Sequence, residues 1–131
     1  MALDDSLQAP VQGADRREVA GVLMDIARIG TGRVKRVVYQ PGFRWSTDMK
    51  PIVGTELCMH AHVGFLVRGQ IEIRYADGCT MQFVAPQPVE IDPGHDGAVI
   101  GDEPAVLIEF DFEGDTVEKF GLPASHQHDR A

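Results

Sequence analysis

The feature that most constrains the fold is a series of short apolar runs separated by turn residues, at intervals of about 8–12 residues. The clearest run alternates, so that Ile71, Ile73 and Tyr75 would share one face of an extended strand. Asp77-Gly78 follows and is typical of a type I′ hairpin turn, and the next run is predicted to return as the partner strand. About eight such strands without a βαβ pattern predict an all-β sandwich or barrel.

One domain is predicted, because 131 residues can bury a core and no internal repeat is visible. Residues 1–16 are interpreted as a flexible arm, residues 17–121 as the barrel and residues 122–131 as a disordered tail with solvated histidines. Residues 17–29 are ambiguous: an irregular or strand-like segment is favoured, and a short helix is the alternative.

The charge of the chain argues against two classes of partner. The formal net charge is −8 and no basic run offsets it, so neither nucleic acid nor an anionic membrane surface is an expected partner. No apolar run approaches the roughly 20 residues that span a bilayer, and the acidic N-terminus lacks the pattern of a signal peptide. The two cysteines, Cys58 and Cys79, are predicted to be free thiols of a cytoplasmic protein.

The candidate chemistry lies in residues 54–69. Glu56, Cys58, His60 and His62 are spaced by two, so an extended strand over residues 56–67 would point all four side chains to one face. Carboxylates, thiolates and imidazoles are the ligand types that bind transition metals. Cys58 is interpreted as a small buried apolar residue, with a soft metal ligand as the alternative.

This stretch resembles the first sequence motif of the cupin family. Gly54 is followed by five residues, by His60-Ala-His62 and by an apolar strand that ends at Gly69. A second stretch, in which His95 follows an Asp-Pro-Gly turn, resembles the second cupin motif. The resemblance covers roughly residues 34–112 and is greatest to small bacterial cupins of unassigned role. It implies a jelly-roll barrel, also called a double-stranded β-helix.

Two ways of counting the first motif are open. In cupins this motif supplies two histidines and a glutamate to a metal. Counting forward from Gly54 places His60 and His62 on the histidine positions, and no glutamate follows. Counting back from Gly69, which we prefer, places His62 on the glutamate position and gives the histidine positions to Glu56 and Cys58. Both counts turn the same face inward, because their offset is even.

The resemblance also implies a site and its occupants. The implied cofactor is a divalent metal ion, iron, manganese, nickel or zinc, and its predicted ligands are His60, His62 and His95. A small organic ligand is expected in the barrel mouth, where its predicted contacts are Trp45, Phe43 and Glu56. A homodimer formed through edge strands is expected as well.

The predicted function is the binding of a metal and a small organic molecule, with dioxygenase, isomerase or decarboxylase activity as candidate reactions. The alternative is a non-catalytic barrel that binds or senses a small molecule without a metal. A third hypothesis is metal-free acid/base catalysis by His62 or His95 together with Tyr39 or Tyr75. The fold alone does not choose among these functions, because one fold hosts many chemistries.

Overall fold

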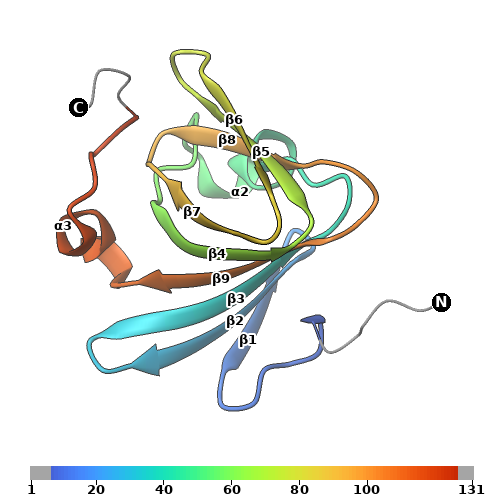
Figure 1. The fold of residues 1–131 in the computed structure, drawn as a ribbon, viewed down its shortest axis with the longest axis vertical. Helices are drawn as coiled ribbons and strands as arrows, with labels where there is room; N and C mark the ends of the chain where they lie inside the picture. The colour runs from blue at the N-terminus through green and yellow to red at the C-terminus, as the bar shows by residue number, and fades with distance from the viewer. Residues whose placement is uncertain (1–6, 127–131) are drawn as a thin grey trace.

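Figure 1 shows the computed structural model of the protein, which describes residues 7–126. Within that range the chain is built mainly from strands, with short helical segments between and after them. In chain order the elements are β1 (Asp15–Val19), β2 (Val22–Ile29), β3 (Gly32–Tyr39), α1 (Trp45–Asp48), α2 (Lys50–Val53), β4 (His62–Arg68), β5 (Gln70–Tyr75), β6 (Thr80–Val84), β7 (Gln87–Ile91), β8 (His95–Val99), β9 (Ala105–Asp111), η2 (Glu113–Asp115) and α3 (Thr116–Phe120).

The strands form two antiparallel sheets. The larger sheet has the order β1-β2-β3-β9-β4-β7, and the smaller has the order β6-β5-β8. Figure 1 shows β5, β6 and β8 on the side of β4 and β7 that faces away from β1, so that the two sheets enclose a barrel. The apolar core between the sheets consists of Leu66, Ile71, Ile73, Tyr75, Phe83, Val89, Ile91, Ala105 and Leu107. The predicted all-β barrel is therefore confirmed.

The alternating strand and its hairpin form as predicted, with a different turn. Ile71, Ile73 and Tyr75 are buried on one face of β5, and β6 pairs with it. Gly78 has a φ of 89°, whereas Asp77 is not in the left-handed region, so the predicted type I′ turn is wrong. The amide of Gly78 donates to the carbonyl of Tyr75 at 2.9 Å, as in a three-residue hairpin loop with one left-handed glycine.

The ambiguous residues 17–29 belong to a hairpin. Val19 pairs with Val22, and the two loop residues Ala20 and Gly21 have φ values of 51° and 80°. Positive φ at both loop residues defines the turn type that matches the twist of paired strands. The strand-like interpretation is thus confirmed over the helix. The turn has no clear sequence signal, because alanine rarely adopts a left-handed conformation.

The N-terminal segment is held against the larger sheet by a buried carboxylate. Asp25 accepts hydrogen bonds from Arg16, at 3.1 and 2.9 Å, and from Arg36, at 3.0 Å, and its side chain is fully buried. The same two arginines donate to the backbone carbonyls of Gln8 and Ala9. Residues 8–16, interpreted from the sequence as part of a flexible arm, therefore contact the larger sheet, and residues 1–6 lie outside the described range.

The region before β4 differs most from the prediction. Two short helices, α1 and α2, form around residue 50, and α2 ends at Gly54, which has a φ of 87°. The amide and the hydroxyl of Ser46 donate to Asp96 at 3.0 and 2.8 Å, which fixes α1 against β8. The predicted strand over residues 56–67 is wrong in its first half, because β4 begins at His62.

Glycine lets β4 approach β9 closely. A Cβ atom on Gly64 would lie 1.9 Å from the carbonyl oxygen of Ile108, so no larger residue fits there without moving the backbone. Gly64 pairs with Glu109, which fixes the register between the two strands and brings Glu109 close to the first residue of β4, His62. The pairing register of β4 and β9 therefore brings His62 and Glu109, which lie far apart in the sequence, together at the candidate site.

Two simpler predictions concern the cysteines and membrane insertion. Cys58 and Cys79 are both free thiols, as predicted. Among residues 7–126, no helix has the length and apolar character needed to cross a membrane.

Candidate metal centre

One thiol and two imidazoles converge at one end of the barrel. The ligand atoms of Cys58, His62 and His95 all lie within 4.8 Å of one another. Cys58 and His95 are buried, and the side chain of His62 is 16% exposed. His62 and His95 are the first residues of β4 and β8, so the two sheets of the barrel each contribute a histidine.

A short antiparallel bridge fixes Cys58 beside His95. The amide of Cys58 donates to the carbonyl of His95 at 2.8 Å, and the amide of His95 donates back at 3.1 Å. The amide of Gly94 adds a third hydrogen bond to the carbonyl of Cys58, at 2.7 Å. Cys58 thus lies outside β4 and is positioned by the turn between β7 and β8.

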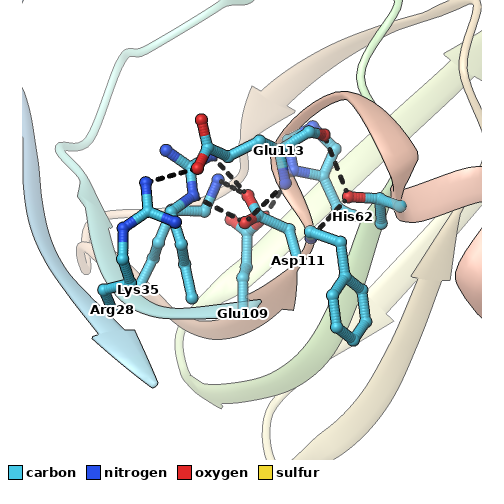
Figure 2. A network of polar contacts seen from close by, with 9 residues as sticks. Arg28, Lys35, His62, Glu109, Asp111 and Glu113 are labelled. Atoms are coloured by element: carbon cyan, nitrogen blue, oxygen red, sulfur yellow. Dashed lines mark hydrogen bonds and ion pairs between the residues drawn. The ribbon is translucent and has the colours of Figure 1, made fainter. Parts of the chain in front are cut away.

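A buried carboxylate orients His62. Its Nδ1 lies 2.7 Å from Oε1 of Glu109, and its Nε2 lies 3.8 Å from Sγ of Cys58. Figure 2 shows Glu109 and His62 directed toward one another. Because a carboxylate accepts hydrogen bonds, Nδ1 carries the proton shared with Glu109, and Nε2 is the nitrogen that faces the cluster.

The backbone orients His95 in the same way. Its Nδ1 donates to the carbonyl of Asp92 at 2.8 Å, so its Nε2 is the nitrogen left to bind a ligand. The amide of Asp92 in turn donates to the hydroxyl oxygen of Tyr75 at 3.2 Å. Both histidines of the cluster therefore have one ring nitrogen engaged by the protein.

The cluster favours a thiolate next to an imidazolium. Burial opposes ionisation of Cys58, but the neighbouring imidazoles, His60 first and then His62 and His95, bring the pKa of the thiol down to about 3. Burial likewise opposes protonation of His62, but the charge of Glu109 and the contact with Cys58 raise the pKa of its imidazole to about 10.

Further charged side chains surround Glu109, among them Lys35 and Asp111 (Figure 2). Burial raises the pKa of Glu109, but the charges of His62 and then Lys35 together lower it by more than burial raises it. The carboxyl group is therefore held ionised. Lys35 lies 2.7 Å from Asp111, which Arg33 also binds at 2.8 and 2.9 Å. Oε2 of Glu109 is buried and has no hydrogen-bond partner in the part of the chain that the structure describes.

The predicted metal ligands are not all together. The structure brings His62 and His95 into the cluster, whereas His60 lies at the surface with its Nδ1 3.9 Å from Sγ of Cys58. Glu56 does not face inward as predicted: its side chain is 90% exposed and pairs with Lys50 at 2.8 Å. The reason is that residues 55–57 form bends between α2 and β4 and belong to no strand, so the strand alternation does not apply to them.

The two predicted aromatic residues occupy different environments. Trp45 is only 7% exposed and begins α1. Phe43 is half-buried, with its ring centroid 4.9 Å from that of Tyr39. Burial, followed by the charges of Glu109 and Cys58, raises the pKa of Tyr39 well above its usual value. Contact of Trp45 or Phe43 with an organic ligand stays a prediction.

For two residues of the site, Cys58 and Glu109, the sequence prediction differs from what the structure shows. Cys58 was interpreted as a buried apolar residue, although counting back from Gly69 had placed it on a ligand position. Glu109 lies in neither of the two cupin-like motifs. What marks Glu109 in the sequence is that it is an acidic residue within the most apolar strand. In the structure, Glu109 faces the barrel interior together with Leu107.

The comparisons with known proteins identify the fold. No protein-family model and no curated protein matches the chain. A cupin 2 conserved barrel domain protein from Salinispora arenicola CNS-205 is 16% identical with a TM-score of 0.57, over 92% of this chain and 96% of that chain. KdgF from Halomonas sp. is 18% identical with a TM-score of 0.51, over 73% and 83% of the two chains. The cupin domain of Cnp3 from Schizosaccharomyces pombe is 12% identical with a TM-score of 0.51, over 83% and 76%.

These structures show that the chain has the cupin fold, a jelly-roll barrel, as the two sequence motifs predicted. Within that fold, the described residues contain a Cys/His/His cluster whose geometry could hold a metal ion.

Proposed function

We propose that this protein binds one thiophilic divalent metal ion, Zn²⁺ foremost, and presents it to a small organic molecule. One observation supports the proposal: Sγ of Cys58 and a ring nitrogen of each of His62 and His95 all lie within 4.8 Å of one another. Three protein ligands with one position left open is the arrangement typical of catalytic zinc sites.

The residues present fit such an ion. Glu109 holds His62 through Nδ1, and the carbonyl of Asp92 holds His95 through Nδ1. Metal-binding histidines usually have this second hydrogen bond, which fixes the ring and the tautomer. A thiolate with two imidazoles suits zinc or copper, whereas manganese prefers oxygen ligands. Of the metals that the resemblance implies, zinc therefore fits the donor set best.

His60 enters the proposal as an outer ligand. It lies on the exposed side of Cys58, 3.9 Å from the same sulfur atom. We place it at the fourth position when no organic molecule is bound.

A bound Zn²⁺ would act as a Lewis acid that polarises an oxygen atom of the organic molecule. The chain's own contribution is to hold His62 and His95 rigidly and to bury the cluster, which limits competition from water. Because Zn²⁺ has no redox chemistry, the proposal favours an isomerase or decarboxylase over a dioxygenase. The predicted contacts with Trp45 and Phe43 and the predicted homodimer remain part of this proposal.

Titration of the untagged, metal-free protein with Co²⁺ tests the proposal. Cobalt replaces zinc at tetrahedral sites, and a thiolate ligand adds a charge-transfer absorption in the near ultraviolet. We expect saturation at one equivalent, loss of this absorption in Cys58→Ser, and weak binding in His62→Ala and His95→Ala. Cys79→Ser is the matched control and should behave as wild type. A metal-free binding barrel would be indicated instead if Co²⁺ did not bind. A wild-type spectrum in Cys58→Ser would contradict the assignment of the thiolate as a ligand.

A further inference from the structure

The chain returns to the barrel after α3. Figure 1 shows the C-terminal segment leaving α3 and running along the side of the barrel toward the turn between β7 and β8. At its end the ring of His126 stacks on the ring of Tyr75, with centroids 3.9 Å apart and an interplanar angle of 7°. The side chain of His126 is only 13% exposed, so the prediction of a solvated histidine is wrong. His128 lies outside the described residues.

Both neighbours of His126 hold a member of the cluster in place. The ring of Tyr75 meets the ring of His95 edge-on at 6.3 Å, and its hydroxyl oxygen accepts from the amide of Asp92. The carbonyl of Asp92 accepts from Nδ1 of His95 at 2.8 Å, and its carboxylate lies 3.8 Å from Nδ1 of His126. His126 therefore touches the two groups that position His95.

The same turn positions the cysteine. Asp92 begins the turn that continues to Gly94, and the amide of Gly94 donates to the carbonyl of Cys58 at 2.7 Å. A displacement of this turn would loosen Cys58 and His95 together, since the two residues are bridged to each other.

We propose that residues 121–126 form a strap that clamps the turn between β7 and β8, with His126 as a positioning residue for the Cys/His/His cluster. While the strap is docked, Tyr75 is covered, the turn is fixed and Cys58 is shielded. When the strap detaches, the turn is released and reagents reach Cys58. This inference depends on the geometry of the chain and not on a bound metal, so it can fail or succeed separately from the proposed function.

The rate at which Cys58 reacts with a small aromatic disulfide reagent tests the strap. The measurement uses metal-free, full-length protein that carries Cys79→Ser, so that Cys58 is the only thiol. Loss of one stacked aromatic pair should increase the population of the open state about three- to tenfold, and His126→Ala should react faster by that ratio. A chain that ends at Gly121 should react at least as fast. His126→Phe keeps the ring and loses Nδ1, so it should react at close to the wild-type rate.

Hydrogen exchange gives a second readout that does not use the thiol. The amides of Asp92 and Gly94 should exchange faster in His126→Ala than in wild type, whereas amides in β2 and β3 should be unchanged. Circular dichroism confirms that each variant keeps its fold. Unchanged thiol reactivity in both His126→Ala and the truncated chain would overturn the strap. Equal acceleration of exchange throughout the barrel would overturn it as well, because it would indicate general destabilisation.

Discussion

Replacing Glu109 by glutamine should weaken metal binding while preserving the barrel. Glutamine has the size of glutamate, so the packing around this 2% exposed residue is kept. What is lost is the charge that holds the Nδ1 proton of His62, at a distance of 2.7 Å. The amide group can also turn its NH₂ toward His62, which would favour the tautomer that places a proton on the ligand nitrogen.

The expected loss follows from the position of this carboxylate. Removing the hydrogen-bond partner of a metal-binding histidine costs about 10- to 100-fold in metal affinity, or about 1.4–2.7 kcal/mol. Because Glu109 is buried, water does not replace the lost interaction, and we expect the upper part of that range. The assay is competition for Zn²⁺ between the protein and a chromophoric chelator.

Asp111→Asn is the matched control. Asp111 lies two residues along the same strand and is also buried, but its ion pairs are with Arg33 and Lys35. This variant should lower the free energy of unfolding and leave the zinc affinity near that of wild type. The reasoning is refuted if Glu109→Gln binds zinc as tightly as wild type. It is also refuted if both variants weaken binding equally.

Two further predictions concern stability. Asp25→Asn removes the buried charge that two arginines share and should lower the free energy of unfolding by about 3–5 kcal/mol. The folded state holds the pKa of Asp25 below its ordinary value, so this contribution is present above about pH 4 and is lost as the pH falls further. Urea unfolding at several pH values should show the difference shrinking in acid, and a constant difference would contradict the assignment. Gly64→Ala should unfold the barrel or sharply lower its melting temperature, because the added Cβ would meet the backbone of β9 at 1.9 Å. Gly114→Ala, where nothing lies within 4 Å, should change the stability by less than about 0.5 kcal/mol, and equal effects of the two variants would argue against the close approach.

The strands of the barrel could be predicted where local pattern and burial agree. In β5, every second residue is apolar and is also buried, so the sequence alone indicates both the strand and its inner face. The same pattern is misleading at residues 56–62, where four candidate ligands are spaced by two. There the chain has not yet entered β4, and Glu56 turns to solvent to pair with Lys50. The helices α1 and α2 have four residues each, which is too short for a helical period to show.

The candidate site was predictable in part, because the motifs mark ligand positions but not their partners. His62 and His95 could be proposed from the two motifs, and Cys58 from the count that starts at Gly69. Glu109 could not, since its contact with His62 depends on the register between β4 and β9, which are separated by 47 residues at this point. Long-range strand pairing is set by the packing of the whole barrel and has no local sequence signal.

Elemental analysis of the protein, purified without a histidine tag and without chelators, is the most direct test of the proposed metal centre. We predict close to one equivalent of zinc per chain in the wild type and in Cys79→Ser, and strongly reduced zinc in Cys58→Ser. A wild-type protein that contains no metal and takes up none on dialysis against zinc would contradict the metal centre. Full zinc content in Cys58→Ser would contradict the assignment of the thiolate as a ligand.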